Sequence, residues 1–183
     1  DIKKEFALVG LKLNADKCKV QCSMEVPRSA TALKVDGDEF PFVSSTEGFQ
    51  LLGTRYTLKG GTKEEVKHRI KVAWGKFHQI WPLLRHRASS LHKRLKLFNA
   101  IVGRSFLWCS ESWTLTVAEK LKIQAVQRSM LRRFAAPSRQ TGEDWVHWIR
   151  RATKIAEANA TAAGVQSWVQ QHLEAKWRWA GQI

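Results

Sequence analysis

The residues that most clearly suggest a function are the many lysines and arginines between residues 62 and 113. After Glu65 no acidic residue occurs before Glu111, while lysine, arginine and histidine recur throughout. Such a run can neutralise the phosphates of a nucleic acid, and each contact releases condensed counterions. Contacts of this kind position a duplex without reading its sequence. The candidate phosphate contacts are Arg69, Lys71, Lys76, Lys93, Arg94 and Lys96.

Histidine and cysteine, the usual protein ligands of zinc, lack the spacing of a metal site. The four histidines of the basic run are ten, eight and six residues apart, which does not gather them on one face of a helix. The three cysteines form an odd set without zinc spacing, and we interpret them as free thiols in a reducing, intracellular compartment. No metal or other cofactor is therefore predicted. These residues are His68, His78, His86, His92, Cys18, Cys22 and Cys109.

Composition favours a nucleic-acid partner. The 183 residues include 31 lysines and arginines against 16 acidic residues, a net charge of +15. A hydrophobic fraction of 44% argues against disorder, and no apolar run approaches the ~20 residues that a membrane span needs. A basic amphipathic module that lies on a membrane or an acidic protein partner remains an alternative.

Apolar residues recur through the cations with the spacing of one helical face. They are Val66, Ile70, Ala73, Trp74, Phe77, Ile80, Trp81 and Leu84. Thr62 and Glu65 fit a capping box at the start of this helix. Pro82 has no amide N–H, and we expect it to end or kink the helix near Trp81. The helix is thus predicted to be apolar on one side and cationic on the other.

Later helices are predicted from a cap followed by an apolar repeat. Ser89 or Ser90 can cap the second helix. Thr116 opens a capping box for the third, and Pro137 follows its end. One or two more helices are predicted after about residue 142.

Residues 159–164 fit either a break in this last region or continuous helix. Tryptophans at helical spacing are predicted to lie in the core, with base stacking as the alternative role. These are Trp74, Trp81, Trp108 and Trp113.

The first sixty residues have strand and turn signals instead. A helix is predicted over residues 2–9 with Gly10 as its stop, followed by a half-buried strand over residues 18–22. The turn at residues 36–38 joins two strands into a hairpin, and residues 49–58 form the next extended segment.

The predicted fold is therefore α+β, a small β-rich part followed by an all-helical bundle. We predict three regions: residues 1–60, a helical region over 61–137, and a helical C-terminal extension over 138–183.

Short motifs follow one another in a fixed order along the chain. Residues 10–17 have the pattern Gly-Leu-x-x-Asn-x-x-Lys, a hairpin follows at 35–40, and residues 49–53 read Phe-Gln-Leu-Leu-Gly. Next come an Arg-Ile-x-x-Ala helix, a Lys-Leu helix, a Glu-x-Trp element, a Leu-Arg-Arg run and a terminal Trp-x-Gly-Gln. These segments are 69–73, 93–97, 111–113, 131–133 and 179–182.

This order resembles the reverse transcriptases of non-LTR (LINE-type) retrotransposons. The resemblance implies that residues 1–60 are the end of the palm and that the following helices are the thumb. It implies that Lys17 approaches the incoming triphosphate and acts as a general acid for pyrophosphate. It also implies that Phe49, Leu52 and Gly53 form the primer grip, where glycine lets the backbone approach the primer.

The chain departs from the family at informative positions. Leu51 stands where tyrosine is usual, and Gln182 where histidine is usual. The family's Asp-Asp pair, which holds catalytic magnesium, would precede Asp1. Asp36 and Asp38 belong to a hairpin tip and are not predicted to replace it. We therefore expect a fragment of an RNA-directed DNA polymerase, inactive alone and requiring the upstream palm and fingers.

The partners implied are an RNA–DNA hybrid or a DNA duplex, bound through its backbone, and the location implied is nuclear. An alternative is a stand-alone basic helical protein that binds nucleic acid without polymerase activity. Its reading frame would have an in-frame stop upstream, where the polymerase would have its Asp-Asp pair.

Overall fold

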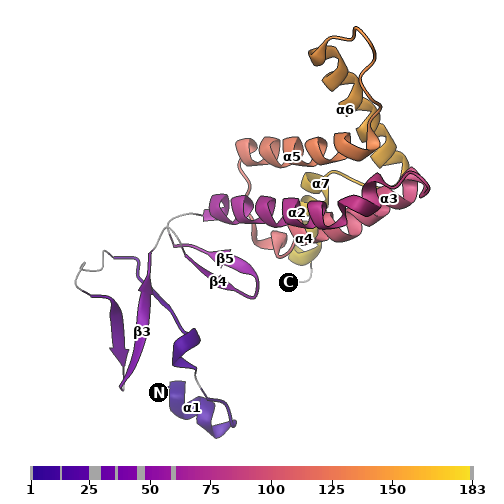
Figure 1. Cartoon of the computed structure of the whole chain (residues 1–183). Helices are drawn as coiled ribbons and strands as arrows, with labels where there is room; N and C mark the ends of the chain where they lie inside the picture. The colour runs from indigo at the N-terminus through magenta and orange to yellow at the C-terminus, as the bar shows by residue number, and fades with distance from the viewer. Residues whose placement is uncertain are drawn as a thin grey trace. The chain divides into compact units, whose positions relative to one another are not determined.

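The computed structural model describes residues 2–12, 14–24, 30–35, 37–44, 48–58 and 61–181. The chain divides into two compact units, Asp1–Glu64 and Glu65–Ile183. Short strands lie in the first unit, and the second is helical (Figure 1). The predicted α+β fold, with a small β-rich part ahead of a helical bundle, is confirmed.

The N-terminal unit begins with α1 (Ile2–Leu8), whose end is set by Gly10. Gly10 has φ +74°, a left-handed conformation that glycine adopts without a Cβ clash. The amides of Leu11 and Gly10 donate to the carbonyls of Phe6 at 2.8 Å and Ala7 at 3.1 Å, which is a Schellman motif. The predicted glycine stop is therefore confirmed. A short 3₁₀ helix, η1 (Ala15–Lys17), follows.

Three short strands form the first sheet of this unit. They are β1 (Val20–Gln21), β2 (Ala32–Val35) and β3 (Asp38–Val43), in the order β1-β3-β2. The antiparallel pair β2–β3 closes at Val35 opposite Asp38, which confirms the predicted hairpin, and Asp36 lies outside the described residues. The strand predicted over residues 18–22 is only two residues long, and it pairs in parallel with β3.

The extended segment predicted over residues 49–58 is instead a second hairpin. Its strands are β4 (Phe49–Leu51) and β5 (Thr54–Tyr56), and Leu51 pairs with Thr54. Leu52 and Gly53 form the turn, with φ values of +48° and +83°. Two positive φ angles in a two-residue loop are typical of a type I′ turn, which usually has Asn-Gly or Asp-Gly. Leu-Gly lacks that signal, so the turn could not be predicted from its residues.

The helical unit is entered along α2 (Gly61–Arg85), and both ends of this helix differ from the predicted ends. The helix begins at Gly61, so Thr62 lies inside it and is not its N-cap. Pro82 does not end the helix near Trp81, because the last turn continues to Arg85. The buried Ile80 and Leu84 hold both sides of Pro82 on the core, and their burial offsets the missing hydrogen bond.

The next helices have the caps that the sequence predicts. Ser90 caps α3 (Leu91–Phe98), and Thr116 forms a complete capping box with Glu119 at the start of α5 (Val117–Ala135). Between them lie a π-helical turn, η2 (Asn99–Gly103), a short α4 (Arg104–Phe106) and a 3₁₀ turn, η3 (Ser110–Ser112). Pro137 lies just past the end of α5, as predicted.

After residue 138 the chain forms α6 (Trp145–Ala162) and α7 (Trp168–Ala180), with a break between them at residues 163–167. The buried Ala152, Ala156 and Ala160 recur every fourth residue on α6, and α6 packs along α5. Small side chains at this spacing let two helices approach closely. Ala156, Ala160 and residues of α7 belong to the same core as α2–α5.

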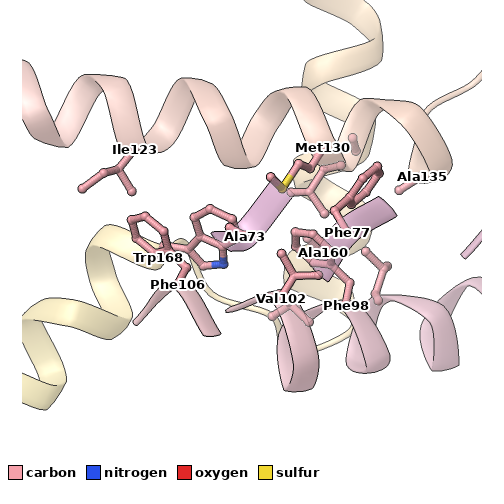
Figure 2. Packing of buried hydrophobic residues seen from close by; sticks show 14 of the residues in the cluster. Ala73, Phe77, Phe98, Val102, Phe106, Ile123, Met130, Ala135, Ala160 and Trp168 are labelled. Carbon is pink, nitrogen blue, oxygen red and sulfur yellow. The ribbon is translucent and has the colours of Figure 1, made fainter. Parts of the chain in front are cut away.

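A stack of aromatic rings forms the centre of this core (Figure 2). The Trp168 indole lies 4.5 Å from the Phe106 ring and 5.9 Å from the Phe98 ring, with interplanar angles of 17° and 15°. Trp113 is buried, and Trp74 and Trp81 pack half-buried against the core. Trp108 is 53% exposed, so the expectation that it belongs to the core was wrong.

Gly103 is required by the close approach of Trp168. A Cβ at Gly103 would lie 2.7 Å from Asn99 Oδ1 and 3.2 Å from Trp168 Nε1. We therefore expect Gly103→Ala to lower the free energy of unfolding by about 1–3 kcal/mol, measured by urea titration. Gly75→Ala is the matched control: its Cβ would meet nothing within 4 Å, and alanine favours the helix by about 0.5–1 kcal/mol. A Gly103→Ala protein as stable as Gly75→Ala would contradict this packing.

A second contact fixes the chain just before α6. Arg151 Nε and Nη2 donate to the two carboxylate oxygens of Glu143, both at 2.7 Å. The hydrogen bond from Arg151 and one from the backbone of Gln140 lower the pKa of Glu143 from 4.5 to about 2.

Since the pKa of Glu143 is lower in the folded chain, its contribution to stability is present above about pH 4.5 and is lost as the pH falls through about 2. We expect Glu143→Gln to reduce stability at neutral pH and to abolish this part of the pH dependence. Urea titrations between pH 2 and pH 7, with an NMR titration of the Glu143 carboxyl, measure both effects. An NMR pKa near 4.5 would contradict the bidentate pair.

Candidate nucleic-acid interface

Nearly all of the net positive charge lies in the helical unit. Residues 65–183 include 21 lysines and arginines against 7 aspartates and glutamates, a net charge of +14 out of +15 for the whole chain. An unevenness of this size concentrates the attraction for a polyanion on one unit. The burial and contacts of each cation decide which of them can take part.

One face of α2 carries a line of exposed cationic and histidine side chains. Lys67, Lys71, His78 and Arg85 are separated by four, seven and seven residues and are all exposed. Spacings of four and seven place residues above one another on a helix. The line therefore runs along most of the length of α2.

A cation from a distant part of the sequence joins this line. The Arg133 guanidinium of α5 lies 4.8 Å from the centroid of the Trp74 ring, a cation–π contact. The same indole stacks on His78 at 5.7 Å with an interplanar angle of 26°. Figure 1 shows α5 running alongside α2. We call the resulting set the α2–α5 basic surface: Lys67, Lys71, Trp74, His78, Arg85 and Arg133.

Of the predicted contacts, Lys71, Lys76, Lys93 and Lys96 are exposed. Lys93 and Lys96 are three residues apart on the outer side of α3. Lys76 is five residues from Lys71, about 140° around the helix. Its Nζ lies 3.1 Å from Gln79 Oε1. The four lysines therefore do not share one face.

Arg69, predicted as a phosphate contact, is buried and has a structural role. Its side chain is 6% exposed, and its Nε lies 2.6 Å from Oε1 of Glu65, which is 4% exposed. The guanidinium also donates to the carbonyl of Ser105 at 3.4 Å. A buried ion pair one helical turn apart neutralises Arg69, so the expectation of a surface contact here is corrected.

Arg94 is likewise half-buried and binds backbone carbonyls. Its Nη1 donates to the carbonyl of Leu84 at 2.8 Å and to that of Phe134 at 3.5 Å, while Nε donates to Ser89 at 3.2 Å. Leu84 and Phe134 lie in the last turns of α2 and α5, whose final carbonyls have no partner within the helix. Arg94 therefore ties together two helix ends, where a positive charge is favourable.

The other predicted site residues lie in the N-terminal unit. Lys17 is exposed at the end of η1, and its amide is held by the carbonyl and side-chain oxygens of Asn14 at 3.1 and 3.3 Å. Phe49 is half-buried and stacks with Tyr56 at 6.1 Å. Leu52 is 85% exposed in the hairpin turn beside Gly53. Leu52 thus lies at the tip of the β4–β5 hairpin.

Among the described residues, no group of three or more His, Cys, Asp or Glu side chains is placed to hold a metal ion. Cys18, Cys22 and Cys109 are free. Over the same described part, no helix combines the length and apolar character needed to cross a membrane.

Part of this interface could have been predicted from the sequence. The spacing of Lys67, Lys71, His78 and Arg85 is a local pattern. The contact between Arg133 and Trp74 is not, because 59 residues separate the two in the sequence. Comparison of the chain with protein-family models, curated proteins and solved structures finds no match.

The burial of the Arg69–Glu65 ion pair predicts that substituting Arg69 lowers the stability of the helical unit. Arg69→Ala removes the arginine that neutralises the buried Glu65, so we expect the free energy of unfolding to fall by about 3–5 kcal/mol in urea titration. The double variant Glu65→Leu with Arg69→Met removes both charges and should cost far less. An Arg69→Ala protein as stable as the wild type would show that the pair contributes nothing.

Proposed function

We propose that the helical unit binds the sugar–phosphate backbone of a nucleic-acid duplex through the α2–α5 basic surface. The observation that supports the proposal is that two helices bring cations close to Trp74. Arg133 of α5 contacts the Trp74 ring, and Lys67 and Lys71 lie along the same face of α2. Cations aligned along a helix can follow successive phosphates, and they do so without reading bases.

Charge distribution supports the same proposal. The net charge of +14 on the helical unit favours a polyanion over a neutral partner. Lys93 and Lys96 extend the exposed positive charge onto α3. Arg69 and Arg94 do not belong to the interface, since their guanidinium groups hold the bundle together.

We further propose that the chain is part of a reverse transcriptase of the non-LTR type, with the helical unit as its thumb. The order of motifs in the sequence supports this proposal. In that role the helical unit would hold the primer–template duplex, with the exposed tip at Leu52 and Gly53 approaching the primer. Lys17 would act on pyrophosphate, and the polymerase's magnesium ligands would come from the upstream palm.

Equilibrium binding across a salt series tests the interface. Fluorescence anisotropy with a labelled RNA–DNA hybrid, a DNA duplex and a single strand of equal length should give tighter binding to the duplexes. Lys71→Ala should weaken binding to both duplexes and lower the slope of log K against log salt by about 0.9, the value for one lost phosphate contact.

Lys154→Ala is the matched control, because Lys154 is an exposed lysine on α6 and its loss changes the net charge equally. It should leave the slope unchanged. Equal effects of the two variants would indicate attraction by net charge alone and would contradict a defined surface. Tighter binding to anionic vesicles than to duplex would instead favour a membrane-binding role.

A further inference from the structure

One indole on the α2–α5 basic surface holds side chains from two different helices. The Arg133 guanidinium of α5 lies 4.8 Å from the centroid of Trp74, and the His78 imidazole stacks on the same indole at 5.7 Å. Arg133 and His78 are exposed, whereas Trp74 packs half-buried against the core. The two exposed groups are therefore held close together by a ring that is itself anchored in the bundle.

The imidazole of His78 has a second aromatic neighbour. The buried Phe77 ring meets it edge to face, at 5.7 Å with an interplanar angle of 81°. Aromatic rings on two sides restrict the rotation of the imidazole. A group that is already oriented loses less entropy when it binds a ligand, so His78 is preorganised for a contact at the surface.

Both exposed side chains keep their donors for a partner outside the chain. Across the described residues, no hydrogen bond or ion pair involves the side chain of His78 or that of Arg133. A guanidinium held against an aromatic ring still presents the N–H groups around its edge. Donors from α2 and α5 are therefore available at one place on the surface.

The charged groups around this pair are all positive. Lys71 and Arg85 lie seven residues to either side of His78 on the same face of α2. No acidic residue of α2 follows its second turn, and the acidic residue of α5 lies in its first turn, at the opposite end from Arg133. With no carboxylate of either helix nearby, the group that complements this cluster is an anion from outside.

Building on the proposed duplex function, we propose that His78 and Arg133 bind the same backbone phosphate and that His78 does so in its protonated form. A protonated imidazole has two N–H donors and a positive charge, whereas the neutral ring has one donor and no charge. A phosphate between the two side chains favours the charged ring, so duplex binding takes up a proton. Because such coupling is reciprocal, acidification from about pH 8 to pH 6 strengthens duplex binding.

Fluorescence anisotropy with the full chain and a labelled blunt DNA duplex tests the proton linkage. At constant salt, the affinity at pH 6 should exceed that at pH 8 by about 2- to 5-fold, the range for one exposed ion pair. The slope of log K against log salt should steepen by up to about 0.9, because one phosphate contact is added. His78→Gln keeps a hydrogen-bond donor but cannot become charged, so it should remove both effects.

His147→Gln is the matched control, because His147 is an exposed histidine on α6 and its loss removes one titratable side chain equally. This variant should retain the pH effects of the wild type. An equal loss in the two variants, or a wild-type pH effect that survives in His78→Gln, would overturn the proposal.

A double-mutant cycle tests whether the two side chains share one phosphate. At pH 6, His78→Gln and Arg133→Gln should each weaken duplex binding by about 2- to 5-fold, and the double variant should lose less than the product of the two losses. Lys93→Ala combined with His78→Gln is the control: Lys93 lies on α3, so its loss should multiply with that of His78. Multiplicative losses for His78 and Arg133 would overturn the shared contact.

Failure of this proposal is distinct from failure of the duplex function. At pH 8 the wild type should still bind duplex, and Lys71→Ala should still lower the salt slope more than Lys154→Ala does. That result, with no change in affinity or slope between pH 8 and pH 6, would contradict the role of His78 alone. Equal effects of the two lysine variants would contradict the duplex surface and this phosphate site together.

Discussion

The helical unit depends on the stacking of Trp168 between Phe98 and Phe106. These three rings come from α7, α3 and α4, so their contact joins elements that are distant in sequence. The stack also depends on Gly103, because the missing Cβ at this position leaves space for the Trp168 indole. The segment around α4 is thereby held against α7.

Positive charge in this chain serves two different purposes. Arg69 and Arg94 lie inside or between helices, where one is neutralised by Glu65 and the other binds the carbonyls that end α2 and α5. Arginine suits both tasks, because its planar guanidinium can bond several acceptors at once. Lysines such as Lys71 remain at the surface. A run of cations in the sequence is therefore a mixture of interior and surface groups.

Short sequence motifs predicted much of the secondary structure. Contacts between residues far apart in the sequence could not be predicted from them. The Thr116 capping box, the Gly10 stop and the β2–β3 hairpin each depend on a few neighbouring residues, and all three are confirmed. Pro82 was expected to end α2, but the burial of Ile80 and Leu84 on either side of it outweighs the local tendency of proline to end a helix. The burial of Arg69 and the contact between Arg133 and Trp74 arise only when distant segments meet. The sequence therefore could not show that Arg69 and Arg94 hold the helical bundle together.

The uneven distribution of charge has a consequence for how an encounter begins. Residues 1–64 include 10 cations and 9 anions, a net charge of +1, against +14 for residues 65–183. At physiological salt the field of such charges extends about one Debye length, roughly 8 Å, beyond the surface. Within that distance, a polyanion would be attracted to the helical unit more strongly than to the N-terminal unit. The nearly neutral N-terminal unit would contact the polyanion later, through short-range interactions. Electrostatic attraction would therefore decide which unit binds first.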